Sequence, residues 1–228
     1  MQKMKSLDNL SNTSKETVAR LLDVAEILFS DLGYAGTTVR DIAAKSQINQ
    51  ALINYHFKNK RGLFMAIFER RGKVLFEERL MLLSQARNKA GSKPIPLRDL
   101  LYAFIYPPLR IAGESSGGRA FVKLQARLHN EPKEIEQELR SEYYNKVSFQ
   151  FVDELHLTVP QLSIESIAWR LVFVMGLYIY IASNTGRLEV ISRGRCIGSD
   201  WEQALLEMLD FCEHGFLAPI TPASPSCP

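Results

Sequence analysis

The amino-acid sequence predicts an all-α fold, with a small N-terminal head of three helices, a helix-turn-helix within it, and a larger helical body. About nine helices are expected in total. Three observations predict this fold. Apolar residues recur at helical spacing along almost the whole chain. No segment of useful length alternates between apolar and polar residues as a strand does. Two short helical segments, joined by a three-residue turn, lie between residues 38 and 56.

The first predicted helix begins near Thr13, which fits a capping box with Glu16. Gly33 is expected to end this helix, because glycine tolerates the left-handed backbone at a helix end. The apolar stripe of the helix consists of Val18, Leu21, Leu22, Ala25, Leu28 and Phe29. This stripe supplies the surface against which two shorter helices can pack.

The second and third predicted helices form the helix-turn-helix. The second begins at Thr38, and the third runs from Gln50 to His56 with Asn49 as its N-cap. The turn between them is Ser46-Gln47-Ile48. Their shared core is expected to contain Ile42, Ile48 and Ile53, with Ala43 where the two helices cross.

The remaining predicted helices build the body. The fourth begins at Asn59, extends towards Gly91, and is on the order of 40 Å long. Others are expected near 97–112, 118–130, 132–157, 163–184 and 199–214. Pro107-Pro108 should break or kink the first of these. The predicted domains are a flexible tail (1–12), a helix-turn-helix head (13–60), a larger helical body (61–217) and a flexible, proline-rich tail (218–228).

Composition favours a globular protein of the cytoplasm. Hydrophobic residues make up 46% of the 228 residues, which is enough for a core. Three cysteines without CxxC spacing favour a reducing compartment over a disulfide framework or a zinc site. The N-terminus lacks the apolar run of a signal peptide. The most apolar stretch, Leu171 to Ala182, is too short to span a bilayer, so we expect no membrane partner.

The charge is distributed unevenly. Residues 1–90 contain 15 basic and 9 acidic side chains, whereas residues 91–228 contain 13 and 16. A basic N-terminal part suits a polyanionic partner such as DNA, although asymmetry of this size is common in other proteins.

The outward face of the third helix is unusual for a protein surface. It presents Gln50, Ala51, Asn54, Tyr55 and His56. Short polar side chains can hydrogen-bond the edges of bases, and Ala51 allows close approach to a thymine methyl group. Each residue alone would be ordinary packing or surface, so the interpretation rests on their combined order.

The order TT-x-R-D-I-A, then I-N-x-x-x-I-N-Y-H-F, then K-N-K-R-x-L resembles the N-terminal domain of the TetR family of regulators. The Asn-Tyr-His-Phe end is similar to one branch of that family. The resemblance implies that Thr38, Tyr55, His56 and Lys60 contact phosphates. It implies that Arg40, Asn49, Gln50 and Ala51 reach bases or nearby backbone. Asn54, where many members have tyrosine, completes the candidate DNA-binding set.

One departure from the family concerns the turn. The family usually has glycine where this chain has Gln47. A left-handed glutamine costs roughly 1 kcal/mol. We therefore expect a slightly different turn here.

The segment 163–184 is apolar on all sides, which is unusual for a surface helix of a monomer. Together with 199–214 it predicts a homodimer with a four-helix interface. A monomer that wraps this helix completely is the alternative. A dimer would place two recognition helices on a palindromic, double-stranded DNA operator.

Aromatic and polar side chains of the body could line a pocket for an apolar or aromatic effector of unknown identity. The candidate ligand-binding residues are Tyr102, Tyr106, Phe121, Gln125, His129, Trp169 and Tyr178. Aromatic residues at helical spacing are also typical of plain core, so this set is a hypothesis.

The family resemblance predicts a sequence-specific transcription regulator, by default a repressor that a small molecule releases from its operator. An activator, or a helix-turn-helix interaction protein without ligand-controlled repression, is the alternative. No GxSxG, HExxH or Walker motif indicates an enzyme. The pairs His129/Glu131 and Cys212/His214 are too loosely spaced to predict a metal site. We therefore expect no catalytic residue, metal or cofactor.

Overall fold

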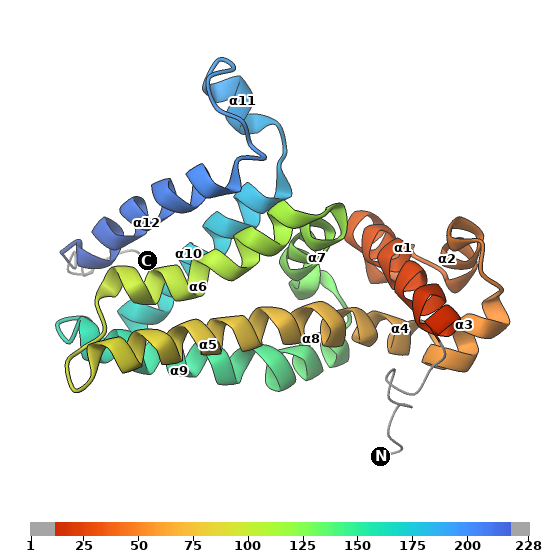
Figure 1. Cartoon of the computed structure of the whole chain (residues 1–228), viewed down its shortest axis with the longest axis horizontal. Coiled ribbons are helices and arrows are strands. Elements are labelled where there is room, and N and C mark those ends of the chain that lie inside the picture. The colour runs from red at the N-terminus through yellow and green to blue at the C-terminus, as the bar shows by residue number, and fades with distance from the viewer. Residues whose placement is uncertain (1–11, 220–228) are drawn as a thin grey trace, which may run out of the picture.

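The computed structural model describes residues 12–219, and these residues form helices and no strands (Figure 1). The head contains α1 (Asn12–Gly36), α2 (Val39–Ser46) and α3 (Gln50–Phe57). The body contains α4 (Lys60–Ile67), η2 (Phe68–Gly72), α5 (Lys73–Ala90), α6 (Leu97–Glu114), α7 (Ser116–Arg127), η3 (Leu128–Asn130), α8 (Lys133–Leu139), η4 (Arg140–Tyr144), α9 (Asn145–Thr158), α10 (Ile164–Ser183), α11 (Arg187–Ile191) and α12 (Trp201–Leu217). The predicted all-α fold is confirmed.

The nine predicted helices are all present, some of them as composite elements. The helix expected from Asn59 to Gly91 is α4 and α5 joined through the π-helical turn η2. The segment 132–157 is α8 and α9 joined through a second π turn, η4. The short α11 was not predicted. The predicted tails fall almost entirely outside the described residues, as does the side chain of Thr13.

The head is a three-helix cluster, at the right of Figure 1, that packs on the stripe of α1. Ile42, Ile48 and Ile53 are buried, as predicted. Gly33 has a positive φ of 75° and interrupts α1, after which the chain makes one more turn to Gly36. Thr37 then fixes the start of α2, since its buried hydroxyl donates to Gly33 O at 2.8 Å.

Pro107-Pro108 was expected to break or kink α6, and the structure shows that the helix does not break. The helix runs from Leu97 to Glu114 with both prolines buried inside it. Pro108 has no N–H, so the carbonyl of Phe104 lacks its helical donor. Arg79 of α5 supplies the replacement, because its Nε donates to Phe104 O at 3.0 Å.

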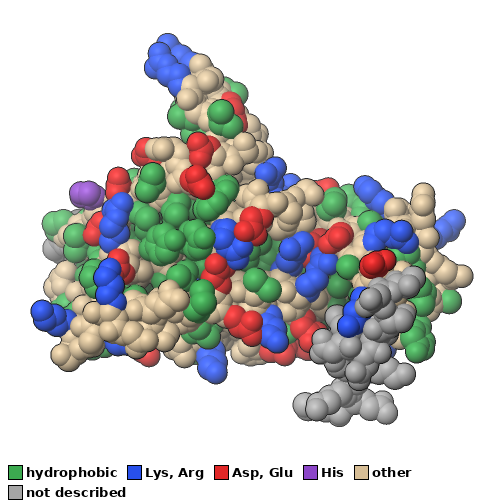
Figure 2. All heavy atoms as spheres, viewed as in Figure 1, with side chains coloured by type: hydrophobic (Ala, Val, Ile, Leu, Met, Phe, Trp, Pro, Cys, Tyr) green, Lys and Arg blue, Asp and Glu red, His purple; other side chains and the backbone are tan. Residues whose placement is uncertain are grey.

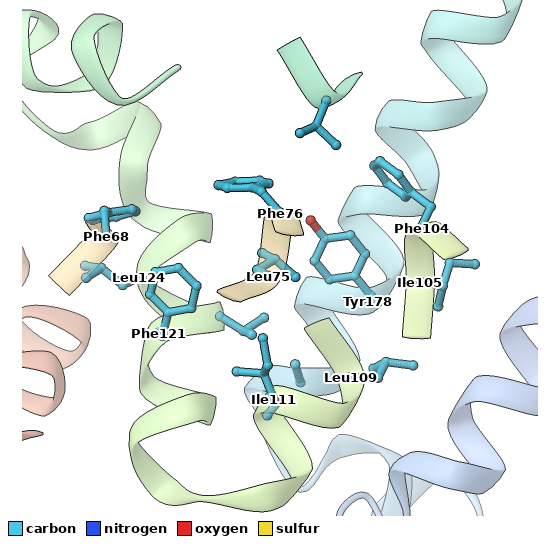
Figure 3. Packing of buried hydrophobic residues seen from close by; sticks show 14 of the residues in the cluster. Phe68, Leu75, Phe76, Phe104, Ile105, Leu109, Ile111, Phe121, Leu124 and Tyr178 are labelled. Carbon is cyan, nitrogen blue, oxygen red and sulfur yellow. The ribbon is translucent and has the colours of Figure 1, made fainter. Parts of the chain in front are cut away.

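The core of the body lies between α5, α6, α7, α9 and α10, and many of its members are aromatic (Figure 3). On the outside, α12 packs against α6 and α10. Arg170 holds α12 to α10, because its guanidinium donates to the carbonyls of Gly215 and Ala218 at 2.9 Å each. Residues 184–200, which include α11 and which we call the arm, project from the body (Figure 1).

A buried ion-pair cluster joins head and body. Glu26 of α1 is completely buried, and its Oε1 lies 2.6 Å from Arg70 Nη2 and 3.0 Å from Arg71 Nε. Gly117 of α7 lies against this cluster, since an added Cβ would be 2.9 Å from Glu26 Oε2. The end of α1 is held too, because Glu131 accepts from the Tyr34 N–H at 3.1 Å.

Candidate nucleic-acid interface

The turn of the helix-turn-helix keeps a left-handed residue without glycine. Gln47 has φ 57° and ψ 33°. Its N–H donates to Ala44 O at 3.3 Å, and the N–H of Ile48 donates to Ala43 O at 3.1 Å. These are the two bonds of a Schellman motif, which satisfies the last carbonyls of α2. The expectation of a different turn was therefore wrong, because Gln47 itself adopts the left-handed conformation.

Helix α3 turns its polar face to solvent. Ile53 and Phe57 are buried and anchor the helix, whereas Gln50, Ala51 and Asn54 are exposed. Asn49 caps the helix, since its Oδ1 accepts from the Ala51 N–H at 2.8 Å. Its amide nitrogen is not needed for the cap. A short exposed helix with small and amide side chains has the shape and chemistry to enter a major groove.

Tyr55 and His56 stand side by side at the end of α3, with their rings edge to face at 5.1 Å. Tyr55 is 68% exposed. His56 is partly buried, and burial lowers the pKa of its imidazole below the ordinary value. His56 is therefore mainly neutral at pH 7 and offers one N–H as a donor.

Thr38 forms the predicted cap of α2, but its side chain already has partners. The Asp41 N–H donates to Thr38 Oγ1 at 3.1 Å, and this hydroxyl donates to Asp41 Oδ2 at 2.6 Å. These bonds lower the pKa of Asp41. A phosphate at this end of α2 would have to displace or tolerate that carboxylate. Arg40, which precedes Asp41 in the first turn of α2, is exposed.

Lys60 has a structural role that the sequence did not indicate. Its Nζ donates to Tyr34 O at 2.9 Å and to Thr37 O at 3.0 Å. It also lies 4.2 Å from the centre of the Tyr34 ring, a cation–π contact. Lys60 thus ties the start of α4 to the connection between α1 and α2. An ammonium group has three N–H donors, so one is left for a phosphate.

Comparison with known proteins places this head within a family. Residues 21–67 match the family model described as bacterial regulatory proteins, tetR family. Residues 102–215, half of the chain, match the model described as tetracyclin repressor-like, C-terminal domain. The chain belongs to the TetR family. Family members and their solved neighbours are regulators, which agrees with the prediction that this chain is not an enzyme.

Members of the TetR family resemble this chain in sequence or in structure. The IcaR negative regulator of the biofilm operon icaADBC from Staphylococcus aureus is 28% identical over 116 residues, which cover 51% of this chain and 55% of that protein. The chain thus spans about half the length of the curated relatives it matches. A TetR-like regulator from Rhodococcus sp. RHA1 has a TM-score of 0.61 at 18% identity, covering 89% of this chain and 97% of that one. A protein described as a transcriptional regulator from Saccharomonospora viridis, in complex with choline, has a TM-score of 0.54 at 18% identity, covering 87% and 96%.

The candidate ligand-binding residues do not form one group in this TetR-family body. Phe121, Gln125 and Tyr178 are buried in its interior. Tyr102 and Tyr106 stack at 4.9 Å on the side of α6 that faces α12. The two remaining candidates, His129 and Trp169, are exposed and face away from the core. The sequence analysis missed Arg79 and Phe76, which are buried beside Tyr178 or its neighbours.

One face of α10 and α12 is apolar and uncovered in the single chain. Helix α10 buries Ile167, Leu171, Val174 and Tyr178, yet it exposes a second apolar stripe. The exposed stripe consists of Trp169, Val172, Phe173 and Tyr180, and α12 adds Leu206, Phe211 and Leu217. Figure 2 shows hydrophobic side chains gathered at the foot of the arm. There a groove of about 820 Å³ runs between α10, the arm and α12.

Helix α10 is longer than the apolar stretch that the sequence suggested. Its 20 residues satisfy the length and mean hydropathy of a membrane span. One of its faces nevertheless packs against α6, α7 and α9. Arg170 on the same helix binds the end of α12. These contacts favour a helix that packs within a protein assembly rather than one surrounded by lipid.

Proposed function

We propose that this TetR-family chain is a dimeric, sequence-specific transcription regulator whose α3 helices enter successive major grooves of a palindromic operator. The exposed polar face of α3 carries the proposal, because Gln50, Ala51 and Asn54 are presented on a helix anchored by Ile53 and Phe57. Amide side chains can form paired hydrogen bonds with adenine, and Ala51 can contact a thymine methyl group. The two recognition helices would lie roughly 34 Å apart, or a multiple of that.

Phosphate contacts would surround this reading surface. Tyr55 and His56 lie at the end of α3, and Lys60 retains one N–H. Thr38 and Arg40 lie at the start of α2, where backbone amides favour anions. Asn49 uses its oxygen in the helix cap, so its amide nitrogen is the donor we assign to DNA. Such contacts hold the head in register without reading sequence.

The dimer would use α10, α12 and the arm. A two-fold axis beside the exposed stripe of α10 would bring two copies of α10 and α12 together as a four-helix interface. Leaving Trp169, Phe173 and Phe211 in water is unfavourable, since each aromatic side chain buried contributes roughly 1.5–3 kcal/mol. The groove beside the arm lies on the same face, so the partner would cover it as well.

We propose repression that a small molecule relieves. The name of the Staphylococcus aureus relative describes a negative regulator, and the Saccharomonospora viridis structure holds choline. Both support a regulator of this kind for the present chain. An activator, or an interaction protein without ligand control, would share the head and the dimer face. As a DNA-binding regulator, the chain would work in the bacterial cytoplasm, at the nucleoid.

Two connections could carry a signal from body to head. The continuous helix α4–η2–α5 belongs to both parts. The second connection is the contact of α1 with α7, where Glu26 meets Arg70 and Arg71. An effector can shift the spacing of the heads only by the difference in its affinity for the two states.

Selection of bound fragments from the host genome, followed by gel shift, tests the proposal. We expect saturable, salt-sensitive binding to a fragment that contains an inverted repeat. Replacing Gln50 by Ala should weaken the binding free energy for that fragment by roughly 1–3 kcal/mol and relax the base preference at one position of the operator. Lys146→Ala on the exposed side of α9 is the matched control. Absence of saturable binding to any fragment would favour the interaction-protein alternative.

A further inference from the structure

The interior of the body contains an arginine without an acidic partner. Arg79 of α5 is only 3% exposed. Among the described residues its guanidinium takes part in no ion pair with a carboxylate. Other arginines on the same helix and on α6 do, since Arg87 of α5 pairs with Glu154 and Arg110 of α6 pairs with Glu78.

Only part of this side chain is satisfied. Nε donates to Phe104 O, and the guanidinium carbon lies 3.9 Å from the centre of the Phe104 ring and 5.6 Å from that of Tyr178. Nη2 is buried and has no hydrogen-bond partner. Burying the remaining charge unpaired is costly unless an anion can occupy the site.

Two further buried polar groups lack partners in the same body. The hydroxyl of Tyr144, on the π turn η4, is buried without a hydrogen bond. Its ring meets Phe76 of α5 edge to face at 4.9 Å. Burial raises the pKa of Tyr144, so the hydroxyl keeps its proton and is a donor. Gln125 of α7 is 8% exposed, and neither its amide nitrogen nor its oxygen has a partner.

The surroundings of Arg79 and Tyr144 are largely aromatic. In Figure 3 the hydroxyl of Tyr178 points into the region between Phe76 and Phe104. Phe104 packs against Phe151 at 5.0 Å and Tyr178 at 6.5 Å. A charged group enclosed by aromatic rings suits a ligand with one anionic end and a hydrocarbon remainder.

We propose that this interior site binds a carboxylic acid with an apolar or aromatic body. Arg79 would hold the carboxylate, because guanidinium and carboxylate match in a forked, charge-assisted contact. Tyr144 would donate a second hydrogen bond, and the rings of Phe76, Phe104 and Tyr178 would cover the apolar part. The inference rests on the proposed function only in making this acid the effector, since binding itself can be measured without DNA.

The turn η4 is the element we expect to move when the ligand enters. A π turn interrupts the regular helical ladder, and such turns are frequent at functional sites. Tyr144 lies on η4, which packs against α5, the helix of Arg79. A shift of this turn would open the site from the side of α8 and α9.

Thermal shift and titration calorimetry on the full chain test the proposal. The probes are octanoate, decanoate and 4-phenylbutyrate, each compared with its amide. We expect at least one acid to raise the melting temperature, with its amide at least tenfold weaker. Arg79→Met, which keeps the volume and removes the charge, should weaken binding of that acid at least tenfold. No shift with any acid, or equal binding of acid and amide, would overturn the proposal.

A second variant covers the case in which Arg79→Met does not fold. Tyr144→Phe removes only the buried hydroxyl and should weaken binding of the acid roughly fivefold, because one hydrogen bond of about 1 kcal/mol is lost. Tyr143→Phe, on the same turn, is the matched control and should bind like the wild type. Equal affinity of Tyr144→Phe and wild type would overturn the assignment. Gel shift on a selected fragment is measured separately, so a failure of the acid site leaves the DNA-binding proposal standing.

Discussion

The Nε of Arg79 donates to the carbonyl of Phe104 at 3.0 Å, and this bond replaces one that Pro108 cannot make. In an α-helix the N–H of residue 108 would bond to the carbonyl of residue 104. Proline has no N–H, yet α6 continues without a break. A side chain from α5 therefore supplies one of the two helical hydrogen bonds that the two prolines remove from α6.

A double-mutant cycle measures this coupling. Pro108→Ala restores the backbone donor, so Phe104 O no longer depends on Arg79. The cost of Arg79→Met should then be smaller in the Pro108→Ala background than in the wild type, by about 1 kcal/mol. Urea unfolding of the four proteins gives the coupling energy. Strictly additive costs would show that the bond contributes nothing to stability.

The sequence predicted the helices and the polar face of α3 because each depends on local pattern. Capping residues and apolar periodicity place Ile42, Ile48 and Ile53 inside without knowledge of distant residues. The continuity of α6 through Pro107-Pro108 was not predicted. One of the hydrogen bonds that support it comes from Arg79, which is remote in the chain. Periodicity does not report such long-range bonds.

The ligand-binding set was predicted less well, for a related reason. Aromatic residues at helical spacing can face either the core or a partner, and composition does not separate the two. Trp169 thus lies 66% exposed on the uncovered face, while Tyr178 is buried on the opposite side of the same helix. Arg79 was missed because a basic residue in an amphipathic helix is usually a solvated one. Only its burial in the folded chain identifies Arg79 as a candidate ligand-binding residue.

Replacing Gln47 by glycine tests the strain of the turn. Residue 47 adopts a left-handed backbone, which costs an L-residue about 1 kcal/mol and glycine almost nothing. Gln47→Gly should therefore be more stable to urea than Gln47→Ala by about 1 kcal/mol. The alanine variant is the control, because it removes the side chain and keeps the strain. Equal stability of the two variants would mean that the turn relaxes on substitution.

The junction of head and body should depend on Glu26. Removing a buried carboxylate that pairs with Arg70 and Arg71 leaves their charges uncompensated, so Glu26→Ala should lose roughly 3 kcal/mol of unfolding free energy. Asp23→Ala is the control. Asp23 lies 2.9 Å from Arg70 but is exposed, and a surface pair contributes less than about 1 kcal/mol. Similar small losses for both would show that the buried cluster does not hold the junction.

Lys60 should affect both stability and DNA binding. Lys60→Met keeps the aliphatic stem and loses the bonds to Tyr34 O and Thr37 O, at a cost of roughly 2 kcal/mol. If its third N–H contacts a phosphate, the dependence of log K on log salt should become shallower by about 0.9. Lys133→Met in the body is the control. Lost stability with an unchanged salt slope would leave Lys60 a purely structural residue.

His56 should make DNA binding depend on pH. Burial lowers the pKa of its imidazole in the free protein, and a phosphate beside the ring would raise that pKa in the complex. Binding would then take up a proton, so affinity should rise as the pH falls from about 7.5 towards 6. The stability of the folded head has the opposite pH dependence. Because folding lowers the pKa of His56, this stability falls as the pH drops below the ordinary value of about 6.5. Binding isotherms should therefore be recorded above pH 6, with His56→Gln as the comparison. A pH dependence that persists in His56→Gln would assign the proton to another group and remove His56 from the phosphate contacts.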